Sequence, residues 1–221
     1  MTQTKAALVN ACVLAFLCVE HNLVDTYVNS TPKLPQREES DTTATEKTLE
    51  LWRFIRFGNP DIPITQHAFF QRLAQLQGPI HDQLVSGATF PWGLLAQLRA
   101  GRYYSGTIQS VIGAISVDTH GNIEACEKFL ARTGLIASLD CVLKKGVIVD
   151  HPRSRLSTVA RSRKVEVHSI QREGDVKDAG VGVSITLDGK QLASVQGCFT
   201  KDEAVVRTAE LAVEILHLDG T

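Results

Sequence analysis

The sequence predicts an α+β fold in which an all-helical domain is followed by a small β-β-β-α module. Three observations lead to this prediction. Hydrophobic residues recur at the 3.6-residue spacing of helices from near the start of the chain to about residue 156. From residue 165 the spacing changes to the alternation typical of strands, with a hairpin signal at Asp188-Gly189. Residues 202–216 then return to helical spacing.

The composition is that of an ordinary globular protein and excludes several classes. The 221 residues are 43% hydrophobic and 21% charged, and 23 basic against 24 acidic residues give a net charge of -1. Nucleic-acid binding must therefore be local, because whole-molecule capture needs a basic excess. The five cysteines are scattered, which favours free thiols. No stretch reaches the roughly 18 apolar residues of a membrane span, so we expect an intracellular protein, cytoplasmic or nuclear, without membrane contact.

The helical part divides at clusters of polar residues, glycine and proline. The polar segment 29–45 carries two prolines and is expected to be a loop. A further interruption is possible at Gly78-Pro79, inside the third helix. The expected helices span residues 5–23, 46–57, 65–77 with an extension to 85, 92–100, 104–116, 123–133 and 135–144.

A basic, polar stretch from Arg153 to Lys164 separates the helices from the module and is interpreted as a linker. The alternating runs predict strands over residues 165–170, 180–187 and 192–198. The predicted domains are therefore a helical domain over 1–156, a basic linker over 157–164 and a module over 165–221.

Two segments carry a family resemblance. The segment TKAALVNACVLAFLCVEH (4–21) resembles the Leu-Val-Asn helix of the ribonuclease III domain, in the form found in the second such domain of fungal Dicer-like proteins. The segment IQSVIGAISVDTHGNIEACEKFL (108–130) resembles that domain's Glu-Ser-Leu-x-Gly-Ala-Ile-x-x-Asp helix and the helix after it. The module is similar in layout to a degenerate double-stranded-RNA-binding domain. Asn10 matches a family position, where we expect it to form a hydrogen bond in helix packing.

The resemblance implies a two-metal endoribonuclease whose ions are held by four carboxylates. Two of these belong to a Leu-Gly-Asp segment that this sequence lacks, and the other two fall on Gly106 and Gln109. Neither residue offers the anionic oxygen that Mg²⁺ prefers. Asp118 lies about 13 Å further along the same helix, too far to substitute, and is expected to cap the next helix. We therefore expect no intact catalytic residue, no metal ligand and no cofactor, with Mg²⁺ or Mn²⁺ required if the domain is active.

Basic residues are the candidates for RNA contact. Where double-stranded-RNA-binding domains have Lys-Lys-x-Ala-Lys, this chain has Lys201-Asp202-Glu203-Ala204-Val205 and keeps one lysine. Arg102 lies where the family often has a lysine near the scissile phosphate. The candidates are Arg102, Arg153, Arg155, Arg161, Arg163, Lys164 and Lys201. Two alternatives stay open, namely a module that packs without gripping RNA and a basic stretch that is only a solvated linker.

These observations favour a catalytically inactive, Dicer-related protein of double-stranded-RNA processing or RNA silencing. Its expected partners are double-stranded RNA, bound weakly, and another ribonuclease III-like domain, in a homodimer or heterodimer. An active double-stranded-RNA endoribonuclease represented by a truncated chain is the first alternative. A structural scaffold, as in the ribonuclease III-like proteins of mitochondrial ribosomes, is the second.

Overall fold

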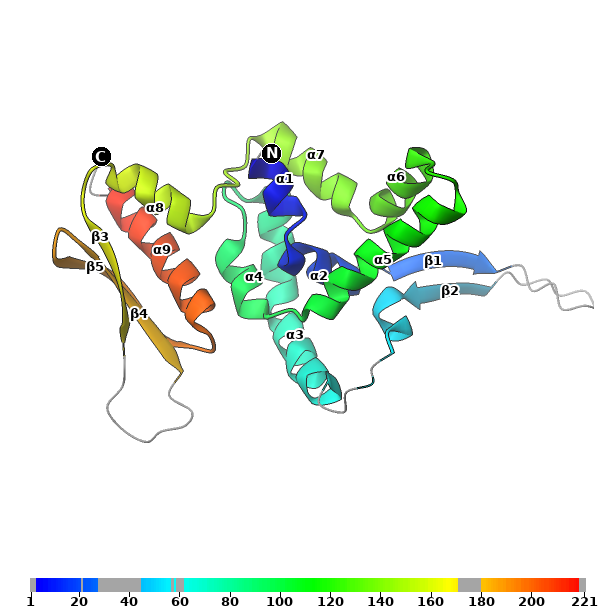
Figure 1. Ribbon diagram of the computed structural model, residues 1–221, viewed down its shortest axis with the longest axis horizontal. Helices are drawn as coiled ribbons and strands as arrows, with labels where there is room; N and C mark the ends of the chain where they lie inside the picture. The colour runs from blue at the N-terminus through cyan, green and yellow to red at the C-terminus, as the bar shows by residue number, and fades with distance from the viewer. Residues whose placement is uncertain are drawn as a thin grey trace, which may run out of the picture.

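The computed structural model describes residues 3–20, 22–27, 45–56, 58, 62–170 and 180–218 (Figure 1). A mostly helical unit is followed by a three-stranded antiparallel sheet and a C-terminal helix, so the α+β prediction is confirmed. The helical unit contains α1 (Gln3–Leu8), α2 (Ala11–Glu20), β1 (Asn22–Tyr27), β2 (Thr45–Glu50), the 3-10 turn η1 (Leu51–Phe54), α3 (Ile62–Ser86), α4 (Trp92–Leu98), α5 (Arg102–Asp118), α6 (Ile123–Arg132) and α7 (Leu135–Lys145). Within these residues no helix is long and apolar enough to cross a membrane.

The first expected helix is divided in two at Asn10. The Asn10 side chain accepts a hydrogen bond from the backbone N–H of Cys12 at 2.8 Å, which makes it the N-terminal cap of α2. Its role is therefore to start a new helix rather than to join two packed ones. α2 is buried on all sides, from Val13 to Cys18, and packs against α5, where Tyr104 and Ile108 are fully buried. A helix that is apolar all round belongs in a core.

The hairpin β1–β2 corrects the expectation of an all-helical domain. Its strands pair antiparallel, from Asn22 opposite Glu50 to Tyr27 opposite Thr45, on the side of the unit away from the module (Figure 1). The helix expected over 46–57 is therefore wrong, because cross-strand pairing overrides the local helical preference of this short segment. The expected loop 29–45 lies outside the described residues, apart from Thr45.

The remaining helices follow the expected positions closely. α3 extends to Ser86, as in the longer expected version, but the interruption expected at Gly78 and Pro79 is wrong, because the helix runs through both residues. Hydrophobic side chains on one face of α3, including Phe69, Leu73, Ile80 and Leu84, are buried and hold the helix in the core. Tertiary packing thus outweighs the helix-breaking tendency of proline.

The C-terminal module begins with a helix where a linker was expected. It contains α8 (Pro152–Ala160), β3 (Val165–Ile170), β4 (Val181–Leu187), β5 (Lys190–Cys198) and α9 (Lys201–Leu218), with the strands in the order β3-β4-β5. Leu156 of α8 is 3% exposed and packs with Ile185, Ala193 and Ala209 of the sheet and α9. Both helices cover one face of the sheet (Figure 1). Burial of Leu156 and Ala160 stabilises α8 despite its two arginines, of which Arg153 is exposed and Arg155 partly buried.

The turn between β4 and β5 has the predicted chemistry. Asp188 and Gly189 both adopt positive φ, 53° and 80°, as a two-residue hairpin loop requires. The sequence signal and the backbone geometry therefore agree at this position.

Candidate nucleic-acid interface

Helix α5 presents the two positions at which the resemblance places carboxylates. Gly106 is partly exposed and Gln109 is exposed, three residues apart and thus on one helix face. A Cβ atom added at Gly106 would meet no atom within 4 Å, so the space for a larger side chain exists. In the part of the chain that the structure describes, no group of three or more His, Cys, Asp or Glu residues could hold a metal ion.

Asp118 does not cap the next helix as expected. It is the last residue of α5, and the N-terminal cap of α6 is Asn122, whose side chain accepts a hydrogen bond from the N–H of Ala125 at 3.3 Å. The intervening His120 and Gly121 adopt positive φ and extend the turn. This longer turn puts Asn122, not Asp118, directly before α6.

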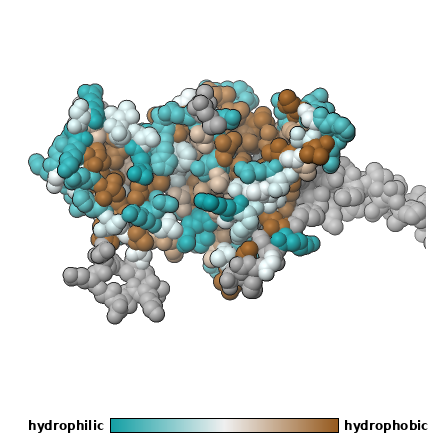
Figure 2. Space-filling model, viewed as in Figure 1, coloured by the Kyte–Doolittle hydropathy of each residue, from teal (hydrophilic) through white to brown (hydrophobic). Residues whose placement is uncertain are grey.

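Three of the candidate arginines line one groove of the module. The groove has a volume of about 340 Å³ and lies between α8, α9 and the strands β3 and β4. Arg153, Arg161 and Arg163 lie along it, with Val165 and Val167 among its apolar residues. On the side of the module visible in Figure 2, hydrophobic and hydrophilic residues lie next to one another on the surface. The arrangement is an apolar floor with a basic border.

Two of the candidate cations near this groove are already paired with carboxylates. Arg163 Nε lies 2.7 Å from Asp188 Oδ2, and Lys164 Nζ lies 2.7 Å from Glu166 Oε1. The hydrogen bond from Arg163 is the main cause of the lowered pKa of Asp188, and the hydrogen bond to Glu166 raises the pKa of Lys164. Both pairs are exposed, so RNA phosphates can compete for the cations. Arg153 and Arg161 have no ion pair with any described residue.

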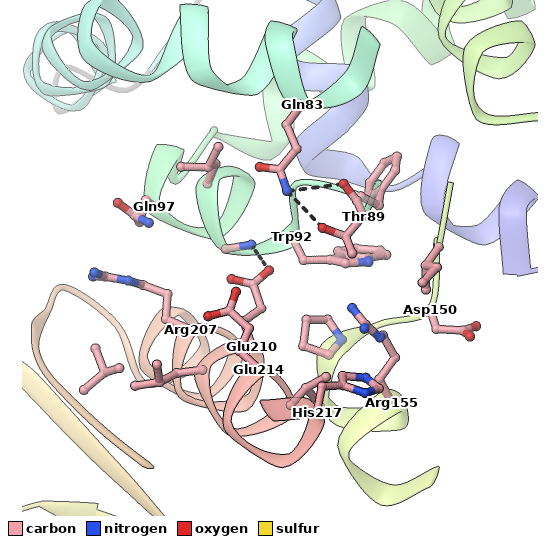
Figure 3. A pocket seen from close by; sticks show the side chains of 18 residues that line it. Gln83, Thr89, Trp92, Gln97, Asp150, Arg155, Arg207, Glu210, Glu214 and His217 are labelled. Carbon is pink, nitrogen blue, oxygen red and sulfur yellow. Dashed lines mark hydrogen bonds between the residues drawn. The ribbon is translucent and has the colours of Figure 1, made fainter. Parts of the chain in front are cut away.

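Arg155 points away from the groove, into the junction between the module and the helical unit. It lines a cavity of about 470 Å³ with Arg207, Glu210 and Glu214 of α9 and with Trp92 and Gly93 of α4 (Figure 3). The structure therefore separates Arg155 from Arg153, although the two are neighbours in the sequence. With 3.6 residues per turn, residues two apart lie on roughly opposite sides of α8, which places the two arginines on different faces.

A carboxylate of α9 caps the first turn of α4 across this junction. Glu210 Oε1 accepts a hydrogen bond from the backbone N–H of Gly93 at 2.8 Å. The first-turn N–H groups of a helix have no partner within the helix, and an anion there is also favoured by the helix dipole. Burial raises the pKa of Glu210, while the Gly93 hydrogen bond opposes that rise.

A second contact across the junction joins Arg99 and Phe199. The Arg99 guanidinium carbon lies 5.2 Å from the centroid of the Phe199 ring. Close by, the start of α8 is fixed to α4, since the rings of His151 and Trp92 are 5.0 Å apart. The helical unit and the module are therefore joined by specific side-chain contacts.

The last two candidates lie at helix starts outside the groove. Arg102 is the first residue of α5 and Lys201 is the first residue of α9, and both are exposed. Neither forms an ion pair within the described residues. Lys201 lies two residues after Phe199, so one of these cations is near the Arg99–Phe199 contact.

Comparisons with known proteins relate the chain to Dicer-like proteins of fungi. No family model matches it, and no solved structure matches it. It is 37% identical to Dicer-like protein 2-1 of Aspergillus niger, and 34% and 32% identical to Dicer-like protein 2 of Aspergillus oryzae and of Aspergillus fumigatus. The matches cover 98%, 98% and 99% of this chain. The chain is a homologue of one segment of fungal Dicer-like proteins.

The resemblance to Dicer-like proteins seen in the sequence is thus confirmed. The chain spans 16% of the length of each of these Dicer-like relatives. The comparison covers both the helical unit and the module, so the two belong to one homologous segment.

Sequence reasoning missed three residues of the junction, Gly93, Arg99 and Phe199. Each acts through a contact with a residue far along the chain, for which no local pattern exists. One signal was readable, because Thr200-x-x-Glu203 is the pattern of a capping box at the start of α9.

Proposed function

We propose that this segment takes part in double-stranded-RNA processing in RNA silencing by binding RNA, without a metal-dependent cleavage centre of its own. The observation that carries the proposal is the pair Gly106 and Gln109 on the exposed face of α5. A two-metal site needs anionic oxygens at such positions, and neither residue supplies one. Homology with Dicer-like proteins supports the RNA-silencing context.

The module groove supports the RNA-binding part of the proposal. Double-stranded RNA is recognised largely by shape and phosphate contacts rather than by sequence. Arg153 and Arg161 at the groove carry charges that no described carboxylate neutralises. The exposed pairs of Arg163 and Lys164 add cations that phosphates can recruit. Binding is expected to be weak, because acidic residues are interspersed.

The second proposed partner is another ribonuclease III-like domain, packed on α5. Gly113 and Ala114 are exposed there, and Val117 is 77% exposed. Small residues let a second helix approach closely, and an exposed valine adds apolar area. A homodimer or heterodimer on this face would be detected by sedimentation of the chain alone and with a partner domain.

The test is a cleavage assay on long double-stranded RNA at low salt with Mg²⁺ or Mn²⁺, with a gel shift from the same reactions. We expect a shift without cleavage, both for the unaltered chain and for Gly106→Asp/Gln109→Glu. The double variant has room for its new side chains at Gly106, yet two further carboxylates are still lacking. Metal-dependent cleavage by either protein contradicts the proposal.

Binding through the groove is tested with Arg153→Gln/Arg161→Gln against Arg132→Gln as a matched control. Arg132 is an exposed arginine at the end of α6, outside the module. We expect the double variant to reduce the slope of log affinity against log salt by about 2, because each lost phosphate contact removes about 0.9. An unchanged slope would place the RNA elsewhere.

A further inference from the structure

Phe199 is a large apolar side chain held out in solvent by an ordered backbone. It lies in the bend between β5 and α9 and is 64% exposed. Its backbone N–H donates to Glu203 Oε2 at 3.0 Å, and the Glu203 N–H donates to Thr200 Oγ1 at 3.1 Å. Thr200 thus caps α9, and Glu203 binds the N–H of the residue before the cap, so this variant of the capping box fixes the bend. The exposure of the ring is therefore a property of the fold and not of a loose chain end.

Arg99 is held beside this ring in a conformation that arginine disfavours. It ends α4 in the left-handed region, with φ 50° and ψ 49°, a position that usually carries glycine. Its guanidinium carbon is 5.2 Å from the Phe199 ring centroid. An arginine at such a site bears a steric strain between its Cβ atom and the backbone that glycine would avoid, which favours a role for its side chain.

Further positive charge gathers around the pair. The Arg72 Nε donates to the carbonyl of Leu98 at 3.1 Å, and its pKa is lowered by burial and by the charge of Arg99. Lys201 follows Phe199 by two residues and is exposed. The nearby carboxylate of Glu203 is 3% exposed and already paired with Arg207 at 3.3 Å. Asp202 is the exposed acid of this turn.

We propose that Phe199 and Arg99 form a stacking site for an unpaired base of single-stranded RNA, with Arg72 and Lys201 directed toward its phosphates. An exposed aromatic ring beside cations is the arrangement by which proteins bind single strands, since every base has a stacking face. A duplex offers no unpaired base to this site. The inference rests on the proposed function only in taking RNA as the ligand.

The experiment measures fluorescence anisotropy of the full chain with two labelled RNAs, a short single strand and a blunt-ended duplex of equal length. Phe199→Ala is expected to weaken single-strand binding by roughly 5- to 150-fold, as loss of one stacked base does, and to leave duplex binding unchanged. Ile123→Ala is the matched control, because Ile123 is 73% exposed on α6.

Arg99→Gly is a second variant that is expected to fold, because glycine suits the left-handed backbone at this position. We expect it to weaken single-strand binding nonetheless. His120→Gly is its control, because His120 also has a positive φ of 54° but lies in the turn before α6.

The outcomes separate this inference from the proposed function. Selective loss of single-strand binding in both Phe199→Ala and Arg99→Gly supports the stacking site. Unchanged single-strand binding in these variants, or an equal loss of single-strand and duplex binding, overturns the stacking site. The proposed function still stands in that case if the unaltered chain binds the duplex. Binding of neither RNA by the unaltered chain overturns both and directs the search to a protein ligand for Phe199.

Discussion

The contact between Gly93 and Glu210 predicts opposite effects of Gly93→Ala on the free energy of unfolding in two proteins, a loss in the unaltered chain and a gain in the Glu210→Ala variant. A Cβ atom at position 93 would overlap the Glu210 carboxylate, so Gly93→Ala must displace that side chain. The displaced carboxylate loses its hydrogen bond from the Gly93 N–H, which is 2.8 Å long in the structure. In the Glu210→Ala background there is nothing to displace.

The magnitudes follow from the groups involved. A hydrogen bond to a charged group contributes about 1.5–3 kcal/mol, while alanine is better than glycine in a helix by up to about 1 kcal/mol. Gly93→Ala should therefore destabilise the unaltered chain by about 1–2 kcal/mol, or roughly 2–8 °C in melting temperature. In the Glu210→Ala background the same substitution should stabilise by up to about 1 kcal/mol.

Urea unfolding followed by tryptophan fluorescence measures all four proteins of this double-mutant cycle. Trp92 lies next to Gly93, and its Nε1 donates to the carbonyl of Val149 at 3.2 Å, so its emission reports on the junction. We expect a coupling energy of about 2 kcal/mol. An equal effect of Gly93→Ala in both backgrounds would refute the assignment of Glu210 as the cap of α4.

Two further stability predictions follow. Burial raises the pKa of Glu20 to about 7 from an ordinary value of 4.5. The folded chain therefore favours the protonated carboxyl group, and this contribution to the free energy of unfolding is fully present below about pH 4.5 and is lost as the pH rises through 7. Glu20→Gln should remove this pH dependence and stabilise the chain by about 1 kcal/mol at pH 8, after allowance for solvent screening; equal urea midpoints of the two proteins at pH 8 would contradict this. Leu156→Ala should cost about 2–5 kcal/mol by urea unfolding because Leu156 is 3% exposed, whereas a cost no larger than that of exposed Ser157→Ala would mean that α8 behaves as a linker.

The parts of the fold that could be predicted are those whose apolar pattern is strong and local. Helix α5 and the Asp188-Gly189 turn are of this kind, since a long periodic run or a two-residue turn defines them without help from the rest of the chain. Helix α8 was missed because its arginines obscure the few positions, Leu156 and Ala160, that it buries. Strands β1 and β2 were missed because each is stabilised by the other across the hairpin.

The residue types of the candidate site could be predicted from the sequence, but which of these residues lie together in the fold could not. The sequence supplied the seven basic residues and the lack of carboxylates at Gly106 and Gln109. Which arginines share a groove depends on the faces of α8, and Arg153 and Arg155 diverge there. The partnership of Arg99 with Phe199 arises only when α4 and the start of α9 meet.

The cap that Glu210 provides on α4 restricts which amino-acid substitutions the helical unit and the module can accept during evolution. The donor is the main-chain N–H of residue 93, so among side-chain substitutions in the helical unit only proline at that position removes the donor itself. To keep this hydrogen bond, the helical unit must have a residue without a Cβ atom at position 93, and the module must have a carboxylate of the right length at position 210. The two parts are therefore compatible when residue 93 of the helical unit is small enough and residue 210 of the module carries a negative charge. A module transplanted onto another helical unit would therefore lose this cap, at a cost of about 1–2 kcal/mol, wherever that unit carries a methyl group at position 93.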